Sequence, residues 1–381
     1  FFAPFPGLLG ADPGIRFGYA GVIWPSMRFS DEPIPNFPHV MAAVGTPAPG
    51  GLDARERAAL VRVFPGSGPV VGRLAELLAE RPADEARLAE FADLVRILTG
   101  VAPDAVAARF AQDMGDASDA GPAMLGGDVA AVCAEFADAL RDAGVDLGPD
   151  EPAAQTLFGG LGKKIWDGAK ELLRQATYYA MKRRAGTVGQ LGLGPALGRL
   201  AQASHGTRVH LVGHSFGARL VSFSLRGLPA SAHNVASVTL LQGAFSHYSF
   251  CGPLPFDSKG GALNGLQHRV SGPLVACHSS HDQALGVFYP LASRLAGDDE
   301  SLLGLGDRWG ALGHDGFQSL DGCGALTLAQ ALAGPLPTSG CVSVDVSTVV
   351  CNGGPPSGAH SDICHPELAR LVLSAAGRLP A

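Results

Sequence analysis

The sequence has little of what several large classes of protein require. Only 5 of its 381 residues are Lys, and its formal net charge is −7, whereas nucleic-acid-binding proteins usually carry a basic excess. Its 7 Cys are scattered without a CxxC pair, so neither a disulfide framework nor a zinc site is predicted, and a reducing compartment such as the cytoplasm is favoured. The longest segment without Asp, Glu, Lys or Arg, Gly227–Phe256, is broken by Pro, Gly, Asn, Gln and His. No membrane-spanning helix and no nucleic-acid partner are therefore expected.

What the chain does have is apolar material. Hydrophobic residues make up 46% and charged residues 17% of the sequence, which is enough for a large core and excludes a disordered chain. Composition changes along the chain and indicates three parts: residues 1–51, rich in Pro, Gly and aromatics; residues 52–183, mostly helical; and residues 184–381, in which strands and helices alternate.

The middle part, residues 52–183, is predicted to be a helical insertion or cap. Apolar residues recur at helical spacing in four segments: Val70–Glu80, Asp84–Leu98, Asp104–Asp113 and Asp128–Ala143. The next segment, Gly162–Arg184, carries 7 basic and 2 acidic residues. One interpretation is a packed helix with a solvated basic face; the other is a lid helix that makes peripheral contact with anionic lipid or substrate.

The last part, residues 184–381, predicts an α/β fold with a mostly parallel sheet and helices on both faces. The expected buried strands are Val209–Val212, Val238–Leu241, Leu274–Cys277 and Val342–Val350. The expected helices are Leu191–Ala203, Phe216–Arg226 and Pro366–Ala376. A further short buried strand is expected at Gly18–Trp24, ahead of Pro25.

The most informative motif is Gly213-His214-Ser215-Phe216-Gly217, which joins an expected strand to an expected helix. This is G-x-S-x-G in the strand–turn–helix context of a nucleophile elbow. A Ser on so sharp a turn has a strained backbone, and we expect Gly213 and Gly217 to remove Cβ atoms that would clash. The following helix and the backbone N–H of Phe216 would stabilise an oxyanion beside the Ser215 hydroxyl.

With this elbow, GHSFGARL, the sequence resembles the α/β-hydrolase superfamily over residues 18–26 and 185–381. The resemblance implies that Ser215 is the nucleophile and that an acid and then a histidine follow it in the chain. Asp282, in the loop after Leu274–Cys277, is the expected acid. His360, on the loop between the last strand and the last helix, is the expected base.

Other assignments remain open at the same loops. Asp345 is a poorer candidate acid because it lies inside an expected strand, and His365 suits a helix cap because Pro366 follows it. His278, His281 and Asp282 give a weak metal-site signal without a fourth ligand. No P-loop or dinucleotide fingerprint is present, so neither a metal nor an organic cofactor is expected.

The chain departs from the superfamily pattern at its beginning. The resemblance implies a strand between Gly18–Trp24 and Val209–Val212, whose loop supplies a second oxyanion N–H, and none is found in 1–17. Since a missing central strand leaves backbone groups unpaired, we expect that the amino-terminal strands are missing from this chain. Phe1–Gly7 is a candidate tail of that oxyanion loop.

The expected function is a serine hydrolase that cleaves a carboxylic ester or similar small acyl compound. His214, Tyr178, Tyr179 and Met181 are the candidate substrate-binding residues; the last three lie where the cap rejoins the core, and each could instead simply pack the cap onto the sheet. Two alternatives use the same fold: a non-catalytic binding module, and an acyltransferase or peptidase with the same triad.

Overall fold

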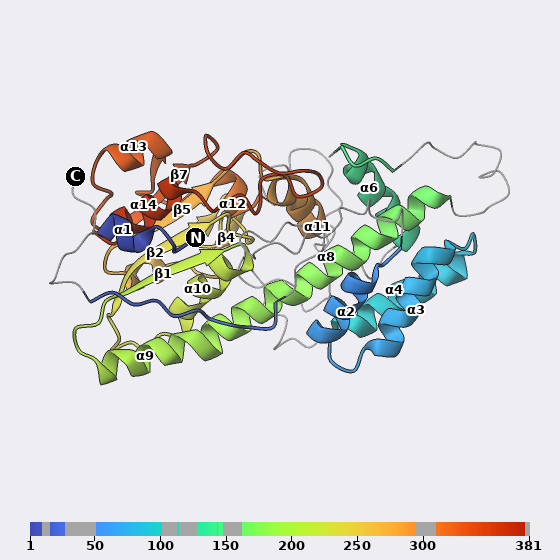
Figure 1. Ribbon diagram of the computed structural model, residues 1–381, viewed down its shortest axis with the longest axis horizontal. Coiled ribbons are helices and arrows are strands. Elements are labelled where there is room, and N and C mark those ends of the chain that lie inside the picture. The colour runs from blue at the N-terminus through green and yellow to red at the C-terminus, as the bar shows by residue number, and fades with distance from the viewer. Residues whose placement is uncertain are drawn as a thin grey trace.

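The computed structural model of the protein describes residues 1–9, 16–26, 51–100, 113, 128–142, 144–147, 162–294 and 310–377. Its centre is a five-stranded sheet of order β1-β2-β5-β7-β6, in which all neighbouring strands are parallel. The strands are β1 (Val209–His214), β2 (Val235–Leu241), β5 (Pro273–His278), β7 (Gly340–Asp345) and β6 (Gly324–Thr327). The chain is thus α/β with a parallel sheet flanked by helices (Figure 1).

Helices cover both faces of the sheet. Alternate residues of its buried strands point to opposite sides, so each face carries apolar side chains. In β5, Leu274 and Ala276 pack in one cluster, and Val275 and Cys277 pack in another. The first face is covered by α9 (Gly194–Ala203) and α10 (Phe216–Gly227), and the second by α13 (Leu328–Ala333) and α14 (Pro366–Ala375). Because the strands are parallel, their carboxyl ends lie at the same edge of the sheet, and the loops that follow them meet there.

Short elements fill the connections between these strands. They are the hairpin β3 (Pro253–Leu254) and β4 (Asp257–Gly260), the 3₁₀-helix η3 (Leu266–Arg269), the π-helix η4 (Ala284–Phe288), and the helices α11 (Tyr289–Arg294) and α12 (Leu312–Asp315). The η4 turn begins two residues after Asp282 and places the following residues against the nucleophile elbow.

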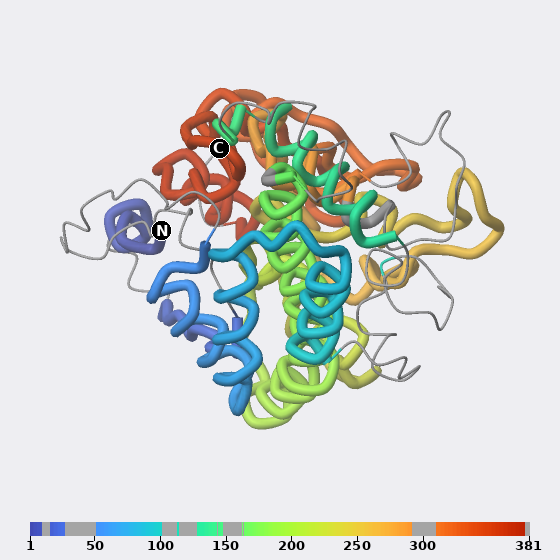
Figure 2. The backbone as a smooth tube through the Cα atoms, turned by 90° about the vertical axis from the view of Figure 1, so that its right-hand side faces the viewer, coloured from blue at the N-terminus to red at the C-terminus, as the bar shows by residue number. Residues whose placement is uncertain are grey.

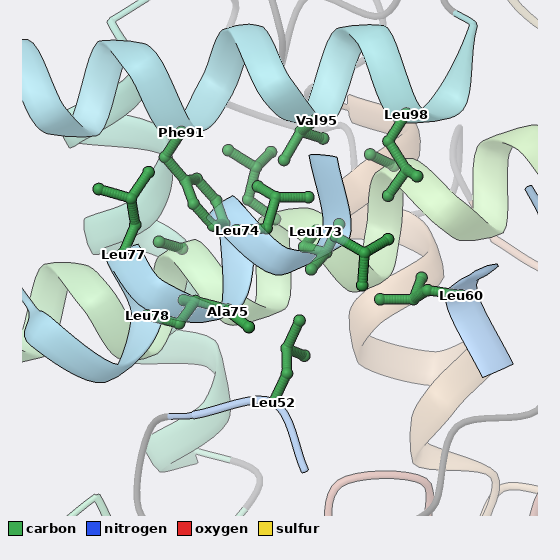
Figure 3. Packing of buried hydrophobic residues seen from close by; sticks show 14 of the residues in the cluster. Leu52, Leu60, Leu74, Ala75, Leu77, Leu78, Phe91, Val95, Leu98 and Leu173 are labelled. Carbon is green, nitrogen blue, oxygen red and sulfur yellow. The ribbon is translucent and has the colours of Figure 1, made fainter. Parts of the chain in front are cut away.

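The predicted insertion is mostly helical in the part that the structure describes. It contains α2 (Ala54–Val63), α3 (Gly68–Glu80), α4 (Glu85–Thr99), α6 (Val129–Asp142) and α8 (Lys163–Thr187). The Asp53 side chain forms a capping box with Glu56, and Asp84 caps α4, which fixes where each helix begins. The helices share an apolar core, part of which is drawn in Figure 3. The expected helix Asp104–Asp113 lies outside the described residues, except for Asp113.

Helix α8 continues without a loop into the core. It is followed directly by the π-helix η2 (Val188–Leu193) and then by α9, whose end leads to β1. One helical run therefore passes from the insertion to the helix layer of the sheet, between α2–α4 on one side and the strands on the other (Figures 1 and 2).

Helix α8 is packed, as one of the two interpretations predicts, but its described basic side chains are buried or partly buried and not fully solvated. Ion pairs with carboxylates of the protein are formed by Lys164, Lys170, Arg174 and Lys182. Arg183 and Arg184 donate to the carbonyl oxygens of Thr99 and Val63, at the carboxyl ends of α4 and α2. Cations at these ends stabilise the unpaired carbonyls of a helix. Much of the positive charge of this segment is thus paired with groups of the protein itself.

Close approach of α8 to α6 depends on one small residue, Gly168. A Cβ built on Gly168 would lie 1.7 Å from the carbonyl oxygen of Cys133 in α6. We expect Gly168→Ala to destabilise the insertion by about 1–3 kcal/mol or more, because the backbones must separate. Gly72→Ala in α3, where a Cβ meets nothing within 4 Å, is the control. Thermal unfolding of both variants tests this, and equal midpoints would contradict the close packing.

The segment Gly18–Trp24 is not the buried strand that its composition predicts. It is extended chain without a sheet partner, and Tyr19 and Ile23 are 77% and 99% exposed. Apolar composition favours burial only where another element offers a surface, and here only Trp24 packs against the core. Residues 1–9 and 16–26 hold no strand, and β1 ends the sheet order on that side.

The second half of Phe1–Gly7 belongs to α1 (Phe5–Leu9), and Phe5 packs against Ala369 and Val372 of α14. Phe1 packs against the cluster that contains Ala359, and Val212 of β1 packs against the same cluster. None of the described helices combines the length and the apolar character that crossing a membrane requires.

Candidate active site

Ser215 lies on a strained turn between β1 and α10. Its backbone has φ 56° and ψ −124°, a region that L residues rarely occupy and that persists only when the surroundings enforce it. Gly213 is required for this turn, since a Cβ there would lie 2.4 Å from the carbonyl oxygen of Gly217. Gly217 itself has open space around its Cβ position. The expected clash at Gly217 is therefore wrong, because that position points away from the turn.

The structure brings Ser215, His360 and Asp282 together although 145 and 78 residues separate the bonded pairs. Nε2 of His360 lies 2.9 Å from Oγ of Ser215, and Nδ1 of His360 lies 2.7 Å from Oδ2 of Asp282. A carboxylate can only accept, so Nδ1 carries the proton and Nε2 is left to accept from the serine hydroxyl. Asp282 is fully buried and its second oxygen accepts from the backbone N–H of Leu285.

The loops that carry Asp282 and His360 are joined by backbone hydrogen bonds. Ala359 donates to the carbonyl of His281, and Ala284 donates to that of Ser357. A third contact fixes His360 from the nucleophile side, because Nε2 of His214 donates to the carbonyl oxygen of His360 at 2.8 Å. His214, expected as a substrate-binding residue, is thus bonded to the backbone of the histidine. Such contacts hold an imidazole in one position before a reaction begins.

Phe216 is the first residue of α10, so its N–H has no acceptor within the helix. It is aligned with the positive end of the helix dipole beside Oγ of Ser215, as an oxyanion donor requires. Its ring lies edge-on to Tyr178 of α8, with ring centroids 5.7 Å apart, and packs with Leu285 and Tyr289 from the segment after Asp282. Apolar side chains from the insertion and from the core therefore meet next to Ser215.

The other two candidate substrate-binding residues belong to the apolar core of the insertion, against which Phe216 also packs. Met181 is buried in the apolar core of the insertion, and Tyr179 packs against the same cluster. Burial raises the pKa of the Tyr179 hydroxyl. Tyr179, one position from Tyr178, points to another side of α8, whereas Met181, three positions on, lies near the face of Tyr178 but is buried in the insertion.

The alternative acid and base are placed elsewhere. Asp345 is the last residue of β7, not an interior one, and its Oδ1 accepts from the backbone N–H of Ser347. His365 precedes α14 at its N-cap, but its ring binds Asp362 and does not cap the helix. In the described part of the chain, no three His, Cys, Asp or Glu side chains are grouped to hold a metal ion.

A second histidine–aspartate group beside the loop of Asp282 was missed by sequence reasoning. Asp315 accepts from Nδ1 of His247 at 2.9 Å and from Nδ1 of His314 at 2.6 Å. Burial opposes ionisation of Asp315, but these hydrogen bonds outweigh it and hold its pKa well below the usual range. The hydrogen bond with Asp315 also raises the pKa of His314. Only the adjacency of His314 and Asp315 could have signalled this group.

A buried ionic group at the junction of insertion and core was also missed. It consists of Asp113, Lys182, Arg219 and Tyr289, which come from four separate segments. Burial lowers the pKa of Lys182 to about 7 and that of Arg219 to about 9. The nearby Asp113 carboxylate opposes both effects by stabilising the cations.

Comparison of the chain with protein-family models, with curated proteins and with solved structures finds no match.

Proposed function

We propose that the protein is a serine hydrolase of the α/β-hydrolase type that cleaves carboxylic esters or similar acyl compounds. The observation that carries this proposal is the relay of two hydrogen bonds, 2.9 Å from Ser215 to His360 and 2.7 Å from His360 to Asp282, with Ser215 on a strained turn. A nucleophile, a base that contacts it and an acid that orients the base are the parts that acyl transfer to serine needs.

In the proposed reaction, Oγ of Ser215 attacks the carbonyl carbon while Nε2 of His360 takes the hydroxyl proton. Asp282 holds the imidazole through Nδ1 and stabilises its charged form. The N–H of Phe216 donates to the oxyanion of the tetrahedral intermediate, a contact of a kind whose removal costs about 10²–10³ in rate. His360 then returns the proton to the leaving alcohol, and water releases the acyl group by the same steps in reverse.

The side chains next to Ser215 favour an apolar acyl group. Phe216, Tyr178, Leu285 and Tyr289 are contiguous there, and Phe216, Tyr178 and Tyr289 are only partly buried. Partly buried aromatic side chains beside a nucleophile provide area for a hydrophobic ligand. Among p-nitrophenyl esters, we therefore expect higher kcat/KM for medium-length acyl chains than for acetate.

The proposal is tested by labelling with a fluorophosphonate, which reacts much faster with an activated serine hydroxyl than with an ordinary one. We expect one label per wild-type chain, located on Ser215 by peptide mass spectrometry, and none in Ser215→Ala. Ser222→Ala is a matched control, because Ser222 is a buried serine of α10 whose hydroxyl bonds the helix carbonyl of Ala218. A well-folded wild type that takes no label would contradict the proposal and favour a binding role for the fold.

A further inference from the structure

One buried carboxylate, that of Asp113, contacts several segments around the candidate active site. Its Oδ2 accepts from the backbone N–H of Ser246 at 3.0 Å, from Nζ of Lys182 at 2.6 Å and from the hydroxyl of Tyr289 at 2.5 Å. Its Oδ1 accepts from Arg219. Asp113 lies in the insertion and is only 5% exposed.

Three of the four partners of the Asp113 carboxylate lie close in the structure to Ser215 or Asp282. Arg219 lies on the first turn of α10, and its backbone N–H donates to the carbonyl oxygen of Ser215. Ser246 is two residues beyond Ala244, whose N–H donates to the same carbonyl. Tyr289 directly follows η4, the turn in which Leu285 donates to Asp282. The carboxylate therefore ties the segment of the nucleophile to the segment of the acid.

Loss of the contacts of the Asp113 carboxylate is unfavourable because its partners include buried charges. Lys182 and Arg219 are two cations in a buried site, and Asp113 is the carboxylate that both contact. Arg219 is fully buried over the ring of Phe223 and also donates to the carbonyl of Lys182. A buried cation that loses its counterion must be rehydrated or move. Loss of the Asp113 charge should thus displace α10 from the segment after Asp282.

We propose that Asp113 is a positioning residue for the Ser215–His360–Asp282 relay, through which the helical insertion sets the separation of the nucleophile from its acid and base. This inference rests on the proposed function for its kinetic consequence, but its structural consequence does not depend on activity. The side chain of Asp113 bonds Arg219, Ser246 and Tyr289, and it acts on the relay through them.

The test compares three variants of the full chain. Asp113→Asn removes the charge with little change in shape, and Tyr289→Phe removes only one hydroxyl from the group. Asp167→Asn is the matched control, because Asp167 forms a partly buried ion pair with Arg81 at 2.5 Å inside the insertion. The first measurement is the second-order rate constant for fluorophosphonate labelling of Ser215. The second is the low-field proton resonance of His360 Nδ1–H, assigned by its loss in His360→Ala.

We expect Asp113→Asn to lower the labelling rate by on the order of 100-fold, as a misplacement of about 1 Å does, and Tyr289→Phe to lower it by about tenfold, as loss of a hydrogen bond to a charged group does. The resonance should shift in both, while Asp167→Asn keeps both wild-type values. If Asp113→Asn does not fold, the two measurements on Tyr289→Phe alone test the positioning role.

Wild-type values for Tyr289→Phe and a folded Asp113→Asn, in both measurements, would overturn the positioning role. Equal losses in Asp167→Asn would also overturn it, because the effect would then be general destabilisation. A wild type that takes no label but whose resonance still responds to Asp113→Asn would reject the proposed hydrolase function and support the positioning role.

Discussion

Asp282→Asn is expected to lower the rate of fluorophosphonate labelling and of ester hydrolysis by about 10⁴-fold. The reason lies in the second oxygen of the carboxylate, which accepts from the N–H of Leu285 at 3.0 Å. In the variant the amide oxygen is needed there, so the amide N–H₂ group faces Nδ1 of His360. The imidazole must then accept at Nδ1 and carry its proton on Nε2, where it can no longer take the proton of Ser215.

The control for this variant is Asp345→Asn. Asp345 ends the neighbouring strand β7, is exposed, and accepts from the backbone N–H of the nearby Ser347. Stopped-flow or steady-state hydrolysis of p-nitrophenyl butyrate measures both variants under the same conditions. Asp345→Asn should stay within about twofold of wild type, since surface changes of this kind have small effects. Retention of more than a tenth of the wild-type rate by Asp282→Asn would remove Asp282 from the relay.

Gly213→Ala is expected to disable the site by moving Ser215 itself. The added methyl would lie 2.4 Å from the carbonyl oxygen of Gly217 and 2.6 Å from the backbone nitrogen of Ala218. Both are backbone atoms at the start of α10, so the turn must open and carry Oγ of Ser215 away from His360. We expect labelling to fall by at least about 100-fold and the free energy of unfolding to fall by about 1–3 kcal/mol.

Gly217→Ala supplies the matched comparison from the same motif. No atom lies within 4 Å of the added methyl, and the position is the second residue of α10. Ala is favoured over Gly in a helix by about 0.5–1 kcal/mol, so this variant should label at the wild-type rate and unfold at an equal or higher temperature. If the two variants behaved alike, the strained turn at Ser215 would not be the feature that sets reactivity.

The parallel sheet and its helices could be predicted because their signals are local. The expected strands before Ser215 and Asp282, and the expected helices after Ser215 and His360, occur with small changes in their ends. The strand expected at Val342–Val350 is shorter and ends at Asp345, because apolar residues beyond it, Val346 and Val350, are buried in a turn and not in a ladder. Burial and strand pairing give the same apolar signal.

Some residues of the candidate site could likewise be predicted from local signals, and others could not. Ser215, Asp282 and His360 could be singled out because each follows a recognisable element in a fixed order. Asp113 could not be, because nothing in its neighbourhood of the sequence indicates Arg219 or Tyr289 as its partners. The basic segment of α8 shows a related limit, because sequence does not distinguish cations that face water from cations that meet carbonyl oxygens and carboxylates inside the protein.

The uninterrupted passage from α8 through η2 into α9 has a mechanical consequence. An α-helix advances 1.5 Å per residue and bends far less easily than a loop. The continuous helix therefore holds the insertion at a fixed distance from the sheet. Tyr178 and Lys182 occupy fixed positions along the axis of α8. A change in the helical twist of Val188–Leu193 would rotate both side chains together about the helix axis. The six residues of η2 therefore set the orientation of the insertion relative to Ser215.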